Sequence, residues 1–175
     1  MIISLIGFMG SGKSLYGRLV AEHYAMEQID LDDFIMKNEE KTINEIFESD
    51  GEKSFRKLER RYLNELVETK NNVILSLGGG TPCQEENWSA IRKTTSIYLK
   101  RTHHFLFHIL KAKKANRPLI KNLNDDKISE LINTMLVSRA PFYERADHVF
   151  DAYGSKIVLA NRLIRKLDVI KSKRL

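Results

Sequence analysis

The sequence predicts an α/β fold in three layers, with a central, mostly parallel sheet of five strands covered by helices on both faces. Short apolar runs alternate along the chain with longer segments in which apolar residues recur three and four positions apart. The first and third runs are almost entirely apolar, which is typical of strands buried on both faces of a parallel sheet. A length of 175 residues indicates one domain, and we expect residues 1–175 to form it.

The apolar runs and the helical patterns define the individual elements. The segments predicted as strands are 2–6, 28–30, 73–77, 96–99 and 148–152. The segments with helical periodicity are 14–25, 54–68 and the basic stretch 156–175. A further helix starts near residue 42, because Thr42 and Glu45 form a capping-box pattern, and a turn is expected at Asp50–Gly51. Alternation of strands and helices predicts ligands at the carboxyl ends of the strands.

The charge and the cysteine content limit the possible partners. The net charge is +6 and the sequence pI is about 9.4, and the excess of basic residues lies in 156–175. We interpret this stretch as a packed amphipathic helix with a solvated basic face, and we keep a nucleic-acid surface as an alternative. Cys83 is the only cysteine, so no disulfide forms within the chain. With no leader sequence and no long apolar segment, we expect a cytoplasmic protein without membrane contact.

A phosphate-binding loop follows the first predicted strand. The stretch GFMGSGKSL places Gly7, Gly12, Lys13 and Ser14 in the pattern G-x-x-x-x-G-K-[ST]. The glycines let backbone N–H groups point inward, and the helix N-terminus adds positive potential. Lys13 then reaches the β- and γ-phosphates, and the Ser14 hydroxyl joins Mg²⁺. The residues expected to hold the nucleotide, ATP, are Gly10, Ser11, Gly12, Lys13, Ser14 and Leu15.

Two carboxylates follow the second predicted strand. Asp30 and Asp32 are two positions apart, and on a strand they point to the same side. Neighbouring carboxylates suit metal binding and general-base catalysis. A plain acidic strand end is the alternative interpretation.

Other polar positions suggest an anionic ligand. Arg56 and Glu59 share one face of a helix, and three glycines at 78–80 allow a ligand to approach the backbone closely. Arg117 and Arg139 carry the planar fork that suits carboxylates and phosphates. Each feature also has an ordinary interpretation: a surface ion pair, a flexible turn or an exposed arginine.

Taken together, these segments resemble the shikimate kinase family. The resemblance runs from Met1 to about Phe150 through GFMGSGKS, DLD, IFESDGEKSFRKLE, SLGGGTP, RPL and RAPFYERA, in that order. It implies a P-loop fold similar to the nucleoside monophosphate kinases. It also implies transfer of the γ-phosphoryl of ATP to the 3-hydroxyl of shikimate, in the route to chorismate and the aromatic amino acids.

On the phosphate side, the resemblance implies a role for each charged residue. Ser14 is a direct ligand of Mg²⁺, and Asp30 holds the ion through water. Lys13 and Arg117 act on the transferred phosphate, with Arg117 carried by a lid at about 111–127. The family often has an arginine against the adenine several residues before RPL. This chain has Leu110 and Lys111 there, and Lys111 is the candidate replacement.

On the acceptor side, the resemblance implies a substrate-binding segment at about 31–62. The residues implied to bind shikimate are Asp32, Arg56, Glu59, Gly78, Gly79, Gly80 and Arg139. Asp32 orients the acceptor hydroxyl and accepts its proton, and the backbone of Gly79 contacts the other hydroxyls. Arg56 and Arg139 clamp the carboxylate, and Glu59 supports Arg56.

Two other functions remain open from the sequence alone. Another small P-loop kinase, acting on gluconate or a nucleoside monophosphate, would share the loop and the architecture. A non-catalytic nucleotide-binding module would use the basic C-terminal stretch to bind nucleic acid. We expect a monomer that binds ATP and shikimate.

Overall fold

The computed structural model describes residues 1–116 and 120–173. Arg117 therefore lies outside the described residues. Among the helices in these two ranges, none combines the length and the apolar content that a membrane span requires.

The sheet has five strands, all of them parallel. The strands are β1 (Ile2–Ile6), β2 (Glu27–Asp30), β3 (Val73–Ser76), β4 (Thr95–Lys100) and β5 (His148–Asp151). Their order is β2-β3-β1-β4-β5, and Ser4 of central β1 lies opposite Leu75 of β3 and Ser96 of β4. All five strands begin and end within one residue of the predicted segments.

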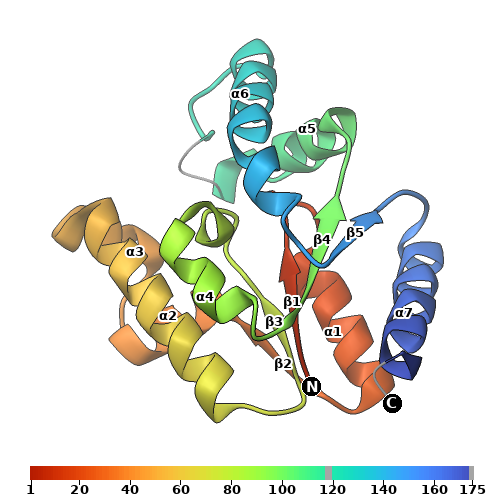
Figure 1. Ribbon diagram of the computed structural model, residues 1–175. Coiled ribbons are helices and arrows are strands. Elements are labelled where there is room, and N and C mark those ends of the chain that lie inside the picture. Colours follow the sequence, from red (N-terminus) through yellow and green to blue (C-terminus); the bar gives the residue numbers. More distant parts are fainter. Residues whose placement is uncertain (117–119, 174–175) are drawn as a thin grey trace.

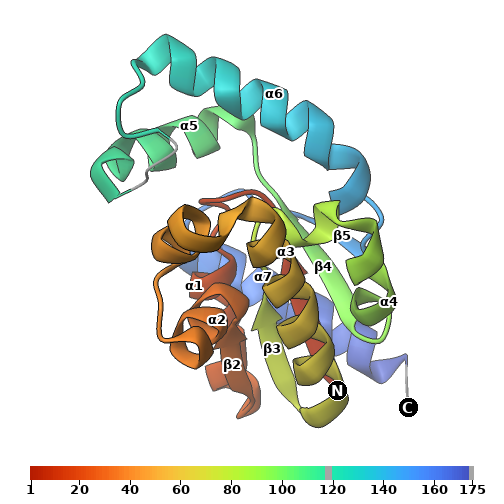
Figure 2. The same cartoon turned by 90° about the vertical axis from the view of Figure 1, so that its left-hand side faces the viewer.

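Helices cover both faces of the sheet. They are α1 (Lys13–Tyr24), α2 (Leu31–Glu39), α3 (Ile43–Thr69), α4 (Trp88–Ile91), α5 (His103–Ala112), α6 (Asp125–Tyr143) and α7 (Lys156–Ser172). Figure 1 shows α1 and α7 on one side of the sheet and α3 and α4 on the other. Helices α5 and α6 lie side by side above the carboxyl ends of the strands (Figure 2). The predicted three-layer α/β/α fold is confirmed.

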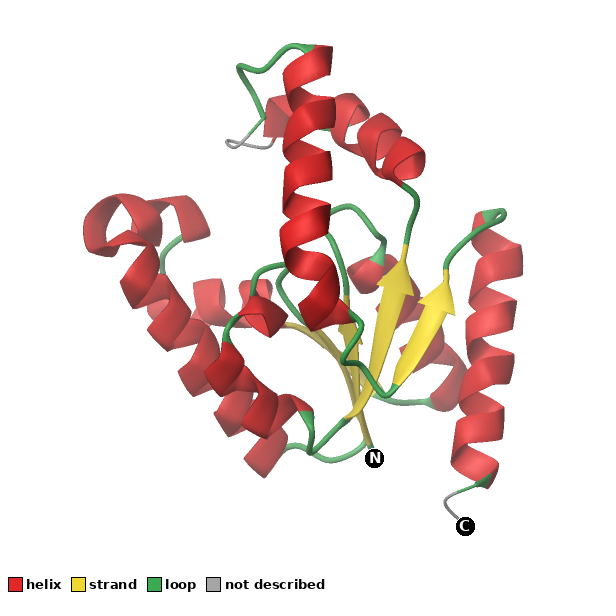
Figure 3. Ribbon diagram, turned by 45° about the horizontal axis from the view of Figure 1, so that its top comes forward, coloured by secondary structure: helices red, strands yellow, loops and turns green. Residues whose placement is uncertain are grey.

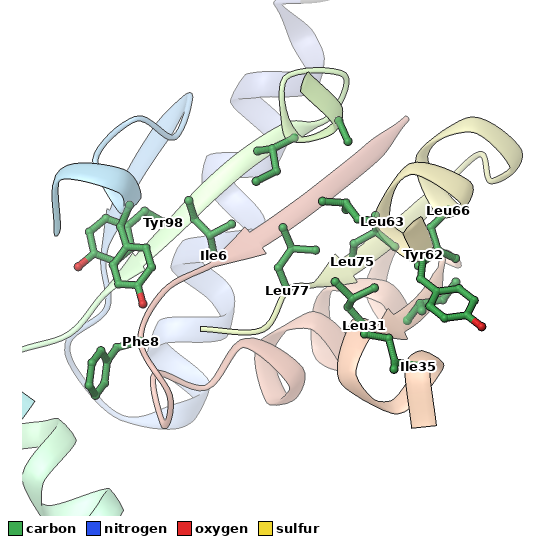
Figure 4. Close-up of a cluster of buried hydrophobic side chains, with 14 of the residues drawn as sticks. Ile6, Phe8, Leu31, Ile35, Tyr62, Leu63, Leu66, Leu75, Leu77 and Tyr98 are labelled. Carbon is green, nitrogen blue, oxygen red and sulfur yellow. The ribbon is translucent and has the colours of Figure 1, made fainter. Parts of the chain in front are cut away.

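The core has two parts because each inner strand is buried on both faces. Ile3 and Leu5 point to the cluster under α1 and α7, and Ile6 points to the cluster under α3. Figure 4 shows the second cluster, in which Ile6 and Leu75 of the sheet meet Leu63 and other apolar side chains of the helices. Each fully buried aliphatic side chain adds about 1.5–3 kcal/mol to the stability of the fold, relative to leaving it exposed. This two-sided burial explains why the sequence of β1 is apolar at nearly every position.

Short-range signals place the start and the break of α3. The Thr42 hydroxyl accepts the N–H of Glu45, and the Glu45 carboxylate accepts the N–H of Thr42, so the capping box is formed. Gly51 interrupts the helix with φ +78° and ψ 168°, a conformation that favours glycine. The expected turn at Asp50–Gly51 is therefore present.

One local expectation needs correction. Strand β2 ends at Asp30, which caps α2, so Asp32 lies in the first turn of a helix and not on the strand. The strand argument for placing Asp30 and Asp32 on one side was wrong. In the segment 111–127, where the lid is expected, α5 continues to Ala112, a 3₁₀ turn spans Lys114–Asn116 and α6 begins at Asp125.

Helix α7 lies beside β5, the last strand of the sheet (Figure 1), and two of its basic side chains reach this open edge. The N–H of Ala152 bonds to β4, so Val149, Asp151 and Tyr153 direct their carbonyls away from β4. Lys166 donates to the Val149 carbonyl at 3.2 Å. Arg162 donates to the carbonyls of Tyr153 and Asp151 at 3.0 and 3.3 Å. Part of the positive charge of this helix thus satisfies backbone acceptors of an edge strand.

Candidate active site

The phosphate loop connects β1 to α1. Gly12, the residue before α1, has φ +99°, and a Cβ there would lie 2.7 Å from the Tyr16 ring. Only glycine fits both the conformation and the space. The Lys13 ammonium donates to the carbonyls of Gly7 and Phe8 at 2.8 and 3.1 Å, so the lysine folds over the loop. A glycine-rich loop at the N-terminus of a helix is suited to bind an anion.

A hydroxyl and a carboxylate meet beside this loop. Ser14 Oγ donates to Asp30 Oδ2 at 2.5 Å, and Asp30 Oδ1 accepts the N–H of Asp32 at 3.1 Å. A hydroxyl with a carboxylate is an oxygen donor set that Mg²⁺ prefers. The two residues expected to hold the metal are therefore in contact.

The Asp32 carboxyl group is held in an unusual environment. Burial raises its pKa to about 6, and the charges of Asp30 and Glu59 act in the same direction, while Lys13 opposes them. Its Oδ1 atom is buried and has no hydrogen-bond partner in the described part of the chain. A carboxylate with this pKa is a good proton acceptor near neutral pH.

Glu59 is the centre of a polar cluster next to Asp32. The Glu59 side chain is 1% exposed. Its Oε2 accepts from Arg56 at 2.5 Å, and its Oε1 accepts from the Thr81 hydroxyl at 2.5 Å. A second contact, with Glu52 on the exposed side, holds the rest of the Arg56 fork. The expected pairing of Arg56 with Glu59 is confirmed, and Thr81 is a partner that the sequence patterns did not indicate.

The glycines after β3 leave room for these polar groups. A Cβ at Gly78 would lie 2.9 Å from oxygen atoms of Asp32, Glu59 and Thr81. A Cβ at Gly80 would lie 2.7 Å from Nη1 of Arg56. The triple glycine is therefore packed among charged side chains and is not a loose turn.

The same glycine loop touches the phosphate loop and α6. A Cβ at Gly79 would lie 3.3 Å from Met9 N and 3.5 Å from Nη1 of Arg139. The Tyr143 hydroxyl donates to the Gly79 carbonyl at 2.6 Å, and burial raises the pKa of this hydroxyl so that it stays a donor. Figure 3 shows α6, which carries Arg139 and Tyr143, running down to the carboxyl ends of the strands.

A cavity of about 280 Å³ opens on the other side of the phosphate loop. Its lining residues come from the loop, α1, the end of β4 and α5: Gly10, Gly12, Lys13, Ser14, Leu15, Tyr16, Arg101, Phe105, Ile109 and Lys113. Ser11 of the loop is fully buried behind it.

The expected replacement of the adenine-side arginine is not at this cavity. Leu110 is buried in the core, and the Lys111 ammonium pairs with Asp125 on α6. One turn of helix places Ile109 and Lys113 at the cavity instead. The role of Lys111 beside the adenine stays a prediction, because spacing from the RPL motif does not determine which face of α5 points to the loop.

Comparison with known proteins identifies the family of this chain. A family model described as shikimate kinase matches residues 9–168. The chain belongs to the shikimate kinase family. The shikimate kinase of Caldicellulosiruptor saccharolyticus is 44% identical over 151 residues, which are 83% of this chain and 82% of that protein.

Solved shikimate kinases have the same structure. The crystal structure of shikimate kinase from Bacteroides thetaiotaomicron superposes with a TM-score of 0.90 at 34% identity, over 96% of this chain and 98% of that one. Shikimate kinase from Acinetobacter baumannii, solved in complex with shikimate, has a TM-score of 0.86 at 31% identity, over 99% of this chain and 94% of that one. The chain is an ATP-dependent kinase, and its membership of the shikimate kinase family speaks against both alternatives left open by the sequence.

Proposed function

We propose that this chain transfers the γ-phosphoryl group of ATP to the 3-hydroxyl of shikimate through the residues described above. The bond between the γ-phosphorus and its bridging oxygen breaks, and a bond between that phosphorus and the shikimate oxygen forms. The hydroxyl proton passes to Asp32, and the products are ADP and shikimate 3-phosphate. The main support is that a Cβ on Gly79 would lie within 3.5 Å of both the phosphate loop and Arg139, because this closeness brings donor and acceptor together.

The acceptor side provides binding and proton transfer. Arg56 and Arg139 bind the shikimate carboxylate, and Glu59 keeps the Arg56 fork in place through its bond of 2.5 Å. Asp32 receives the acceptor proton, since its raised pKa of about 6 matches the task of a general base. The backbone of Gly79 contacts the remaining hydroxyls.

The donor side provides positioning and charge. The loop N–H groups hold the phosphates, and Lys13 leaves its contacts with the Gly7 and Phe8 carbonyls to neutralise the transferred group. Ser14 would bind Mg²⁺ directly and Asp30 through water, and the bound ion would supply positive charge that neutralises the phosphates. Arg117 completes the positive surroundings, carried by a lid at 111–127.

The proposal extends to organisation and location. Residues 1–175 act as one domain, in which 31–62 is the substrate-binding segment. We place the enzyme in the cytoplasm as a monomer, in keeping with its single cysteine.

The decisive experiment is ADP release by purified protein with Mg-ATP and one acceptor at a time. Shikimate is compared with gluconate and nucleoside monophosphates, and the product is identified by mass spectrometry. We expect ADP and shikimate 3-phosphate only with shikimate. ADP release with a control acceptor instead would overturn the proposal.

The residue assignments are tested with Arg139→Ala and, as a control, Arg145→Ala on the same part of the chain. Arg145 pairs with Glu85 and has no place in the proposed chemistry. We expect Arg139→Ala to raise KM for shikimate about tenfold or more, as expected for loss of a charge-assisted hydrogen bond. A rise confined to KM for ATP would show that the carboxylate clamp is misplaced.

A further inference from the structure

Arg101 is a buried cation to which the proposed chemistry assigns no role. It follows β4 directly and precedes α5, and it is only 8% exposed. No sequence motif pointed to it. A buried guanidinium next to a nucleotide loop requires an explanation, because arginine is rarely buried without a partner.

The partners of Arg101 are all neutral. Its Nε donates to the Ser11 carbonyl at 3.1 Å, and its Nη2 donates to the Tyr16 hydroxyl at 3.1 Å. Its Nη1 donates to the Ala152 carbonyl. The guanidinium also lies 3.9 Å from the centre of the Phe105 ring.

No carboxylate in the described part of the chain forms an ion pair with Arg101. Taking a charge out of water without an opposite charge costs free energy. Two of the five N–H donors of the guanidinium also have no bond among the described residues. The Arg101 guanidinium therefore has an uncompensated positive charge and two N–H donors that a ligand could use.

The position of Arg101 indicates what compensates this charge. Its side chain lines the cavity of about 280 Å³ together with Gly12, Lys13 and Lys113. At the same time its bond to Ser11 fixes a backbone group of the phosphate loop. An anion in this cavity would meet Arg101 directly, and a change at Arg101 would also move the loop.

We propose that Arg101 is a positioning residue for the nucleotide. It joins the Ser11 carbonyl of the phosphate loop to the Ala152 carbonyl after β5, 51 positions away from Arg101, and it presents a positive charge that the nucleotide phosphates neutralise. This inference rests on the proposed function only in taking the ligand of the loop to be a nucleotide. It adds a residue that determines nucleotide affinity without acting on the acceptor.

The test compares Arg101→Met, Arg101→Lys and Arg92→Met. Arg92 is an exposed arginine at the other end of β4 and serves as the matched control. Calorimetry measures the Kd of ADP and the Kd of shikimate separately for each folded variant, at two salt concentrations.

We expect Arg101→Met to raise the Kd of ADP about tenfold, the effect of losing one or two hydrogen bonds to a charged group, and to leave the Kd of shikimate within about twofold. ADP binding by Arg101→Met should also depend less on salt than in the wild type. The Kd of ADP in Arg101→Lys should lie between those of the wild type and Arg101→Met, because an ammonium does not bond to three acceptors in one plane. Arg92→Met should bind both ligands as the wild type does.

Three results would overturn the inference. One is an unchanged Kd of ADP in Arg101→Met, and another is an equal loss of affinity for ADP and shikimate, which indicates a merely structural role. The third applies if Arg101→Met does not fold: an Arg101→Lys protein that binds ADP as tightly as the wild type. A wild-type protein that binds ADP but does not phosphorylate shikimate would end the proposed function and leave this inference intact.

Discussion

The Ser14 hydroxyl donates a hydrogen bond of 2.5 Å to the Asp30 carboxylate, and this bond joins the phosphate loop helix to the end of β2. The other Asp30 oxygen accepts the N–H of Asp32 at 3.1 Å. One carboxylate thus connects the donor side of the site with the first turn of α2, where the proposed base is located. The Asp30 charge therefore acts on the donor side and also raises the pKa of Asp32.

Asp30→Asn tests the metal role of this carboxylate. The amide oxygen can still accept the N–H of Asp32, so α2 keeps its cap, but the charge is lost. We expect the Mg²⁺ concentration for half-maximal rate to rise about 10–100-fold, as for other groups that hold a metal through an intermediate ligand. Asp33→Asn, in the same helical turn, is the control and should leave this concentration unchanged. An equal response in both variants would contradict the assignment.

Asp32→Asn should lower the turnover of the enzyme and raise its free energy of unfolding. Burial raises the pKa of Asp32 in the folded protein to about 6, above its unfolded value of 3.8, so its ionisation destabilises the fold as pH rises through this interval. We expect the variant to be more stable than the wild type by roughly 2 kcal/mol at pH 7, after allowance for solvent screening, and equally stable near pH 4.

Urea denaturation from pH 4 to 8 measures this difference in the ligand-free protein. Turnover of Asp32→Asn should be nearly abolished while ADP still binds. An active variant would remove Asp32 from the role of base, and a stability difference that does not change with pH would contradict the raised pKa.

Thr81→Val tests the support of the Arg56–Glu59 pair. Valine has the shape of threonine without the hydroxyl that donates to Glu59 Oε1, so a buried carboxylate oxygen loses its donor. We expect KM for shikimate to rise about tenfold, with a smaller change in kcat and in KM for ATP. Thr81→Ser should restore KM, because serine keeps the hydroxyl. Equal changes in the two KM values would indicate general loosening of the site.

The double variant Arg162→Ala, Lys166→Ala tests the cover on the open edge of the sheet. These side chains satisfy the free carbonyls of Val149, Asp151 and Tyr153, and unpaired edge groups promote association between sheets. We expect more self-association by light scattering on heating, with kcat unchanged. The control is a second double variant, Lys156→Ala with Arg165→Ala, which removes the same charge from α7. It should self-associate less than the first double variant. If both double variants behave alike, net charge and not edge cover is the cause.

Local patterns in the sequence predict most of the fold because their physical causes are local. The apolar alternation of Ile3 and Leu5 with Ile2 and Ile6 is a consequence of two-sided burial. The capping box of Thr42 and Glu45 involves neighbours in one helical turn. The prediction for Asp32 failed because helix capping begins directly at the end of the strand. Asp30 is the N-cap of α2, so Asp32 lies in a helix and the strand geometry assumed for it does not apply.

Patterns along the chain predict the phosphate loop, the parallel sheet and the pairing of Arg56 with Glu59, because spacing of three or four residues, glycine freedom and strand burial act over short distances. The packing of distant segments was needed to show that Arg101 contacts Ser11 and Ala152, that Thr81 donates to Glu59, and that Ile109 and Lys113 line the cavity beside the phosphate loop. These partners lie 22 to 90 positions apart in the hydrogen bonds concerned. Their proximity results from the way the sheet and the helices pack around it, and no periodicity along the chain encodes it.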